Sequence, residues 1–221
     1  MGKLIVIEGS CDGVGKSTQY KLLIDRLINE KEYDITSHHF PSYGTYQGRP
    51  VEEYLKGNFG NHSELSPYFV NSLYAQDRAI TWVTGLKSEY DKGKLIVLDR
   101  YTTSNLAHQG SKILDKEERF NMYQWIDKLE FWLLELPKPD VTIFLHMPYE
   151  YAKELKKNRT SLDEHEKSEA HLRHAEACYL ELKELYNWKY INCIRDNKIR
   201  TIEDINNEVL KLVLEEKREF N

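Results

Sequence analysis

Short apolar runs alternate with longer helical patterns along this chain of 221 residues. Five runs have the length of buried strands, at residues 3–8, 35–40, 95–98, 141–146 and 190–194. Apolar residues three and four positions apart predict helices from residue 16, over 67–90, 115–136 and 168–186, and from residue 202. A short helix is expected over 51–55, ending before Gly57. Strands that alternate with helices indicate a mostly parallel sheet wrapped by helices. We therefore predict a single α/β domain over residues 1–221, with a five-stranded parallel sheet in a three-layer α/β/α arrangement.

A glycine-rich segment follows the first apolar run directly. Residues 10–18 have the sequence Ser-Cys-Asp-Gly-Val-Gly-Lys-Ser-Thr. A strand, a glycine loop and a helix start form a phosphate cradle, because loop N–H groups and the positive helix end both face phosphate oxygens. Lys16 can then reach the outer phosphates, and the Ser17 hydroxyl can bind Mg²⁺. The residues expected to line this cradle are Ser10, Asp12, Gly13, Val14, Gly15, Lys16, Ser17 and Thr18.

The cradle departs from the usual spacing G-x-x-x-x-G-K-S/T in one respect. Ser10 stands at the first glycine position, and Gly9 lies one residue earlier. We therefore expect the loop to bulge where it begins. A chance glycine-rich turn is the alternative, but the preceding strand and the following helix both fit the context that the motif requires.

The third apolar run, residues 95–98, is followed directly by a carboxylate, Asp99, and a guanidinium, Arg100. The sequence of residues 95–101 is Leu-Ile-Val-Leu-Asp-Arg-Tyr. In open α/β sheets, ligands bind beyond the carboxyl ends of the strands. Asp99 and Arg100 should therefore emerge at the same edge as the cradle. Asp99 can hold a water of Mg²⁺, and Arg100 can donate two hydrogen bonds to a phosphate. The alternative is an ion pair on the surface at the end of a strand.

Charge, hydropathy and cysteine content limit which partners and which cellular compartment we expect. The formal net charge is −5 and the isoelectric point is about 5.9, which argues against nucleic acid but not against a nucleotide. No apolar run approaches the about 18 residues of a membrane span, and the first residues do not resemble a signal peptide. Cys11, Cys178 and Cys193 are odd in number and far apart, as in proteins of a reducing compartment. We expect a soluble cytoplasmic protein.

Several segments together carry a family resemblance. They are Glu8-Gly9 with residues 12–19, Phe40-Pro41, Leu-Tyr-Ala-Gln-Asp-Arg at 73–78, the Asp-Arg-Tyr-Thr-Thr-Ser-Asn-Leu-Ala-His-Gln-Gly segment at 99–110, and residues 139–145. In this order they resemble the thymidylate kinase family. The resemblance implies a P-loop nucleoside monophosphate kinase fold and the transfer of phosphate from ATP to dTMP with Mg²⁺.

The resemblance also implies roles for individual residues. The catalytic set would be Lys16, Arg100, Arg159 and Asp12, and the metal ligands would be Ser17 and Asp99. The substrate would contact Asp12, Phe40, Tyr43, Tyr74, Arg78, Arg100, Ser104, Asn105 and His108.

Within this set, Asp12 would bind the substrate 3′-hydroxyl, and Tyr74 would stack on thymine. Arg78 would donate to the thymine carbonyl and lie near the acceptor phosphate. Asn105 would contact the base edge, and Ser104 would shape the turn. A core position for Tyr74, a solvated Arg78 and a capping role for Asn105 are the alternatives.

Residues 149–167 would form a lid. Phosphoryl transfer needs in-line placement and neutralised charge, which Arg159 with Lys156 or Lys157 could supply by closing over the donor phosphates. A solvated basic helix end that pairs with nearby acidic residues is the alternative. The family resemblance also implies a homodimer. Aromatic residues that could form its interface, or could equally belong to the core, are Phe69, Trp82, Trp125, Phe131 and Trp132.

Three departures from the family pattern concern substrate range. Tyr43 stands near a position where an arginine is usual, and His108 replaces the aromatic residue expected to exclude a ribose 2′-hydroxyl. The lid has few arginines. Two other functions therefore stay open: a kinase for another nucleoside monophosphate or for a deoxynucleoside, and a nucleotide-binding regulator without transfer activity.

Overall fold

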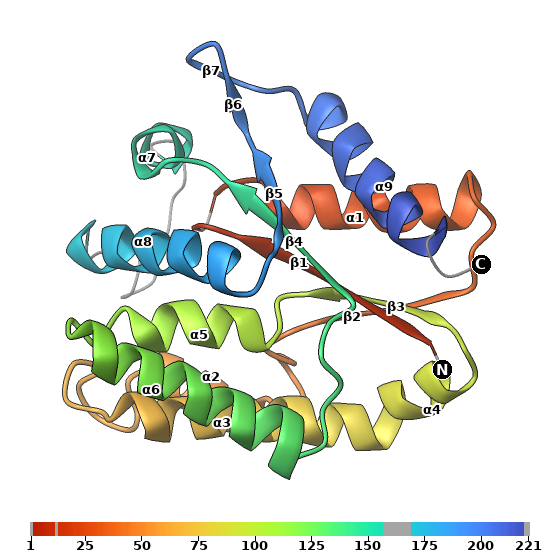
Figure 1. The fold of residues 1–221 in the computed structure, drawn as a ribbon. Helices are drawn as coiled ribbons and strands as arrows, with labels where there is room; N and C mark the ends of the chain where they lie inside the picture. The colour runs from red at the N-terminus through yellow and green to blue at the C-terminus, as the bar shows by residue number, and fades with distance from the viewer. Residues whose placement is uncertain (1, 12, 157–168, 219–221) are drawn as a thin grey trace.

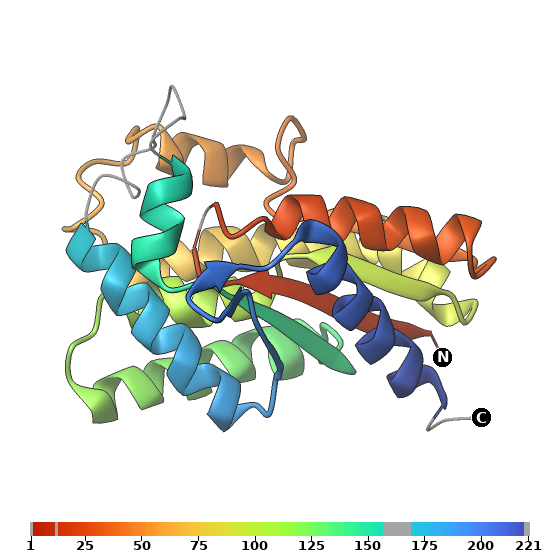
Figure 2. The same ribbon diagram turned by 90° about the horizontal axis from the view of Figure 1, so that it is seen from above.

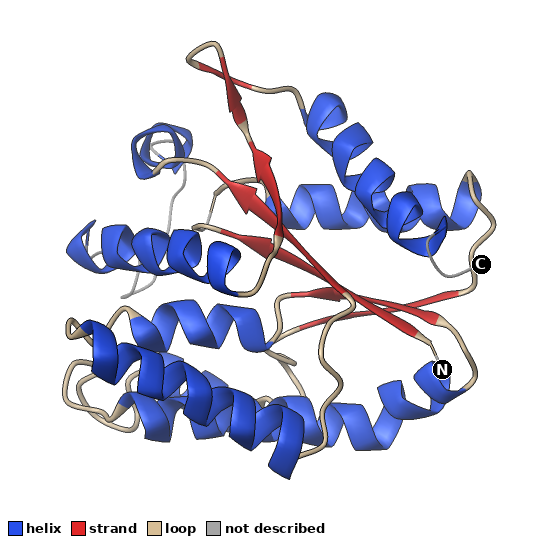
Figure 3. Cartoon of the chain, in the orientation of Figure 1, coloured by secondary structure: helices blue, strands red, loops and turns tan. Residues whose placement is uncertain are grey.

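A five-stranded parallel sheet forms the centre of the chain (Figures 1 and 3). The computed structural model describes residues 2–11, 13–156 and 169–218. The strands are β1 (Lys3–Gly9), β2 (Ile35–His39), β3 (Leu95–Asp99), β4 (Val141–His146) and β5 (Lys189–Asn192), in the order β2-β3-β1-β4-β5. β1, β3 and β4 are almost entirely apolar because they are buried on both faces. This sheet confirms the predicted fold class.

Helices cover both faces of the sheet (Figure 1). They are α1 (Lys16–Asn29), α2 (Arg49–Leu55), α3 (Pro67–Thr81), α4 (Lys87–Asp91), α5 (Thr102–Gly110), α6 (Lys116–Asp127), α7 (Tyr149–Lys156), α8 (Glu169–Leu185) and α9 (Ile202–Arg218). Two π-helical segments, η1 (Trp82–Leu86) and η2 (Lys128–Leu133), continue α3 and α6. None of the helices in the described ranges combines the length and apolar character needed to cross a membrane.

Alternate side chains of β1 point to opposite faces of the sheet, and each set belongs to a different core cluster. Ile5 and Ile7 pack with α1 and α9, whereas Leu4 and Val6 pack against η1. Successive residues of a strand point to opposite sides, so a run of apolar residues serves both layers. On the second face, Phe144 of β4 packs against α5 and α8. β4 lies directly beside β1 in both ribbon views (Figures 1 and 2).

The register of the sheet positions the glycine loop. Ile7 of β1 pairs with Asp99 of β3, and Gly9 pairs with Leu145 of β4. The strands are parallel, so the loop after Gly9, the residues after Asp99 and the start of α7 all leave the sheet at one edge.

Three elements are missing from the sequence prediction: α5, α7 and a small hairpin of β6 (Ile194–Arg195) and β7 (Lys198–Ile199). α5 has no continuous apolar stripe, because Thr102, Thr103 and Ser104 contact buried carboxylates instead. The helix predicted over 67–90 is interrupted by the π-helical turn of η1.

The five aromatic residues proposed for an interface fall into two groups. Trp82 is buried in the core, and Trp125 and Phe131 are partly buried against core clusters. Phe69 and Trp132 are 43% and 71% exposed. Trp82 therefore cannot form an interface without unfolding, whereas Phe69 and Trp132 are accessible.

Candidate active site

The glycine loop is shaped by close packing at its start and by left-handed backbone at its end. A Cβ at Gly9 would lie 2.7 Å from Cγ1 of Val14, so any larger residue here would force Val14 to shift. Gly15 has a φ of 86°, a conformation that favours glycine, and α1 begins at the next residue. Ser17 and Thr18 in the first turn are exposed. The start of α1 therefore presents backbone N–H groups and a hydroxyl to solvent, as a phosphate site requires.

Ser10 ties the start of the loop to β4. Its hydroxyl donates to the carbonyl oxygen of Met147 at 3.0 Å and accepts from the N–H of Met147 at 3.1 Å. Its own N–H donates to the carbonyl oxygen of Leu145 at 3.0 Å. Strand pairing thus continues to the end of β1. The expected bulge stays a prediction, because Asp12, in the lengthened part of the loop, lies outside the described residues.

Replacing Ser10 by alanine is expected to lower the free energy of unfolding by about 1–3 kcal/mol, because both buried groups of Met147 lose their partner. Urea denaturation measures this change. Ser72→Ala is the matched control, since Ser72 is exposed on α3 and its hydroxyl contacts only the local Phe69 carbonyl. Equal midpoints for the two variants would contradict the role given to Ser10.

Lys16 and Asp99 meet at the sheet edge. Lys16 Nζ donates to Oδ1 of Asp99, and Nδ1 of His39 lies 3.0 Å from Oδ2. Burial lowers the pKa of Lys16, and the nearby charge of Arg100 lowers it further. Burial raises the pKa of Asp99, but hydrogen bonds and charge from His39 and Lys16 outweigh it and lower the pKa overall. Asp99 is therefore ionised. Because its partner is buried Lys16, the alternative of a surface ion pair is wrong.

Arg100 is aimed at this edge by an unusual backbone conformation. Its φ is 67°, and its N–H donates to the Ile7 carbonyl oxygen at 3.1 Å. Its Nη1 lies 3.4 Å from the Ser104 hydroxyl and 3.7 Å from Oε1 of Glu8. Positive φ is rare outside glycine and often marks a functional site. The guanidinium is thus held between a buried carboxylate and α5.

Glu8 is a site residue that the sequence analysis did not assign. Its carboxylate is fully buried and accepts hydrogen bonds from Thr103 at 2.8 Å, Ser104 at 2.6 Å and Tyr179 at 3.3 Å. Ser104 lies inside helix α5, and its hydroxyl bonds to Glu8, so the expectation that it shapes a turn is wrong. A glutamate at the end of the apolar strand Leu-Ile-Val-Ile-Glu was the available signal.

A second buried carboxylate, Glu130, holds Arg78. Nε and Nη2 of Arg78 donate to the two Glu130 oxygens at 2.6 and 2.7 Å, and Nη1 lies 3.3 Å from Oδ1 of Asn105. Asn105 in turn donates to Asn71 at 2.8 Å. Arg78 is 1% exposed, so the alternative of a solvated arginine is wrong, and Asn105 is not a helix cap. Contact of either residue with a base stays a prediction.

Tyr74 lies between aromatic side chains and the two arginines. Its ring is half-buried, with the Tyr54 ring 6.3 Å away in an edge arrangement. Burial is the main cause that raises the pKa of the Tyr74 phenol, and Tyr54, Tyr43, Arg100 and Arg78 are close enough to contribute. Tyr43 itself is 52% exposed. This grouping provides an aromatic surface next to positive charge, as an aromatic base linked to a phosphate requires.

The remaining predicted residues have mixed placements. Phe40 is buried in the core, and its ring lies 6.1 Å from the ring of Tyr101. Its side chain therefore packs within the core. His108 is partly buried with its ring 5.8 Å from Tyr179. Asp12 and most of the proposed lid, residues 157–167 with Arg159, lie outside the described residues. Within the described part of the lid, Lys153 pairs with Glu169 at 3.0 Å.

Lys112 provides a titration test beside this aromatic group. Its Nζ is 3.4 Å from the Tyr54 hydroxyl, and burial lowers its pKa to about 8. An ordinary lysine titrates near about 10.4. NMR titration of the lysine ε-methylene signals should therefore show one signal that titrates near pH 8 and is lost in Lys112→Arg. A Lys112 signal that titrates above pH 10 would contradict the buried placement.

Comparison with known proteins decides the family. A family model described as thymidylate kinase matches residues 7–205. The chain belongs to the thymidylate kinase family. This result confirms the family, the P-loop kinase fold and the ATP-dependent kinase class expected from the sequence.

Relatives within the thymidylate kinase family cover different shares of the chain. The thymidylate kinase of Exiguobacterium sp. is 30% identical over 215 residues, which are 97% of this chain and 95% of that protein. The putative thymidylate kinase 251L of Invertebrate iridescent virus 6 is 35% identical over 146 residues, 65% of this chain. The thymidylate kinase of Schizosaccharomyces pombe is 34% identical over 146 residues, 66% of this chain. The matched region spans only 60% of the viral protein and 61% of the yeast protein.

A solved structure supports the fold alone. The chain superposes on thymidylate kinase from Candida albicans with a TM-score of 0.70 and 24% sequence identity. The match covers 98% of this chain and 92% of that chain. The arrangement of all five strands and their helices is therefore that of the thymidylate kinase family.

Proposed function

We propose that this chain transfers the γ-phosphoryl group of ATP to dTMP, giving ADP and dTDP. The observation that carries the proposal is the meeting of Lys16, Asp99 and Arg100 at one edge of the sheet. The glycine loop supplies a donor phosphate cradle, and Arg100 with Tyr74 and Arg78 supplies an acceptor side. Two phosphate sites at one edge of the sheet suit an in-line transfer between nucleotides.

Residues of this chain also suit Mg²⁺. The Ser17 hydroxyl is exposed beside the loop, and the Asp99 carboxylate is ionised at the same edge. Mg²⁺ prefers such oxygen ligands and keeps several waters. When bound, Mg²⁺ would neutralise charge on the transferring phosphoryl group. Lys16 would bind the outer donor phosphates, and Arg100 would hold the acceptor phosphate in line.

A panel of acceptors tests the proposal. ADP release is measured with ATP, Mg²⁺ and either dTMP, dUMP, ribothymidine monophosphate or thymidine. We expect the highest kcat/KM with dTMP. We expect no reaction with thymidine, because it lacks the phosphate that Arg100 would bind. A reduced preference for the deoxyribose is expected, because His108 replaces the usual aromatic residue. Faster reaction with thymidine than with dTMP would contradict the acceptor site, and ATP binding without any ADP release would indicate a regulator.

A homodimer is the proposed assembly. Exposed apolar side chains on α3, η1 and η2, namely Phe69, Val83 and Trp132, provide a surface for a second copy. Exposed apolar patches often mark a protein interface. Sedimentation equilibrium should give twice the chain mass of 26.2 kDa at micromolar concentration. A single species at the chain mass would remove the dimer from the proposal.

A further inference from the structure

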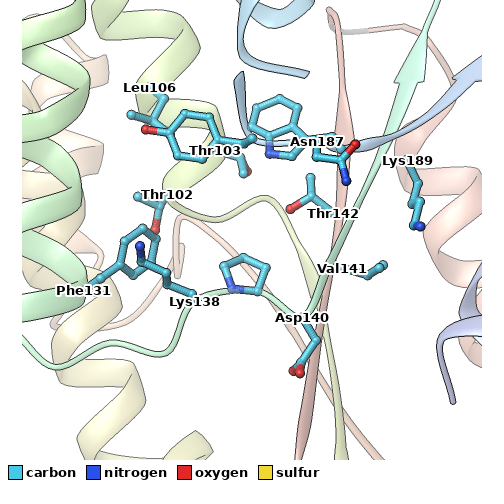
Figure 4. Close-up of a pocket in the computed structure, with 13 residues that line it drawn as sticks. Thr102, Thr103, Leu106, Phe131, Lys138, Asp140, Val141, Thr142, Asn187 and Lys189 are labelled. Carbon is cyan, nitrogen blue, oxygen red and sulfur yellow. The ribbon is translucent and has the colours of Figure 1, made fainter. Parts of the chain in front are cut away.

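A cavity of about 310 Å³ lies away from the phosphate loop, on the face of the sheet that carries α5 and α8 (Figure 4). Val141 and Thr142, at the beginning of β4, form part of its wall. Val141 pairs with Ile5, whereas the opposite end of β4 pairs with Gly9 at the loop. The first two residues of α5, Thr102 and Thr103, separate the cavity from the candidate active site.

The cavity wall combines aromatic rings with positive charge. The rings come from Phe131, Tyr186 and Trp188. Lys138 and Lys189 contribute cations (Figure 4). Lys138 Nζ lies 5.4 Å from the centre of the Phe131 ring. Among the described residues, neither lysine has a carboxylate at ion-pairing distance.

The acidic lining residue, Asp140, is already engaged. Its two oxygens accept from Nζ of Lys3 and from the N–H of Leu4, both at 2.8 Å. In Figure 4 its carboxylate points away from Thr102 and Phe131.

Burial raises the pKa of Asp127, which accepts from the hydroxyl of the lining Tyr186 at 3.1 Å, and the nearby charge of Lys138 opposes that rise. The charge of Lys138 is therefore partly balanced, and the charge of Lys189 is available to an anion. A planar aromatic molecule with one negative group matches this lining, because its ring can pack on the aromatic wall while its anion meets a lysine.

Two hydrogen bonds connect the cavity with the acceptor side. The Thr102 hydroxyl lies 3.3 Å from Oε2 of Glu130, the carboxylate that holds Arg78. The Thr103 hydroxyl donates at 2.8 Å to Oε2 of Glu8, the carboxylate beside Arg100. A molecule that shifts the start of α5 would therefore move the supports of both arginines.

We propose that this cavity binds a small aromatic anion and that its occupancy changes the affinity of the chain for the acceptor monophosphate. The second part rests on the proposed function, whereas binding itself does not. A ligand shifts a site only through different affinities for its two states, and the effect is reciprocal. If the aromatic anion changes dTMP affinity by some factor, dTMP must change the affinity of the anion by the same factor.

Calorimetry with naphthalene-2-sulfonate tests the binding site. We expect binding to the wild-type chain that saturating ATP does not abolish. Lys138→Glu and Lys189→Glu should each weaken it at least tenfold. Lys21→Glu is the matched control, because Lys21 is exposed on α1 outside the cavity and the charge change is the same. Equal affinity in all variants, no detectable binding, or full displacement by ATP would overturn the proposal.

Coupling is tested in the same calorimeter by titrating naphthalene-2-sulfonate with and without saturating dTMP. We expect the two dissociation constants to differ severalfold, and Thr102→Val to reduce that difference while binding persists. Identical constants in the wild-type chain would overturn the coupling. The failures are distinguishable: a chain that binds the sulfonate but transfers no phosphate disproves the proposed function alone, whereas an active dTMP kinase that does not bind it disproves this inference alone.

Discussion

Replacing Lys16 by alanine is expected to lower kcat by about 10²–10³-fold or more. It should also lower the free energy of unfolding, because Asp99 is left buried without its cation. Removing a single preorganised group that stabilises transition-state charge typically costs this much. Lys16 is the lysine at the start of α1, and its Nζ already lies at the sheet edge with Asp99. The change also frees Asp99 from a buried cation, so the pKa of Asp99 should rise. Coupled ADP release with dTMP measures kcat.

The control for this variant is Lys21→Ala, which removes an exposed lysine from the same helix. Thermal denaturation of both variants separates lost transfer from lost folding. A Lys16→Ala chain that keeps the wild-type rate would contradict the assignment of the glycine loop as the donor site.

Replacing Glu130 by glutamine is expected to destabilise the fold by about 3–5 kcal/mol and to raise the KM for dTMP more than the KM for ATP. Removing one member of a buried ion pair leaves the other charge uncompensated. Glu130 is fully buried and receives two hydrogen bonds from Arg78 and weaker contacts from Asn71 and Thr102. Guanidinium denaturation gives the stability change, and initial rates give the two KM values.

Two further variants sharpen this test. Glu135→Gln removes an exposed carboxylate five positions along the chain and should leave both quantities unchanged. The pair Arg78→Met and Glu130→Leu, made together, should recover part of the stability, because no charge is left buried. Equal loss of stability in Glu130→Gln and Glu135→Gln would contradict a structural ion pair at this position.

Elements with a strong apolar pattern could be predicted from the sequence. β1, β3 and β4 are buried on both faces, so nearly every residue is apolar and the strands stand out. α5 could not be predicted in this way, because its first residues are polar and face Glu8 and Glu130. Its position depends on two carboxylates that arrive from β1 and η2, so no local pattern reveals it.

The candidate site also has residues that a local motif predicts and residues that only long-range contacts reveal. Local motifs indicate the glycine loop and the Asp99-Arg100 pair, and the sheet register brings them together. The residues that hold Asp99, Arg100 and Arg78 in place were not assigned. They are His39, Glu8 and Glu130, respectively. Each acts through a contact between segments distant in sequence, which only the folded chain reveals.

The most direct test of the account is the binding of a dTMP moiety joined to an adenosine moiety through a chain of phosphates. The central claim is that donor and acceptor phosphates meet at one edge, between Lys16 and Arg100. Calorimetry should show that this bisubstrate compound binds far more tightly than dTMP or ATP alone, and that Lys16→Ala and Arg100→Met each weaken it at least tenfold. Affinity no better than that of ATP, unchanged by Arg100→Met, would contradict the claim.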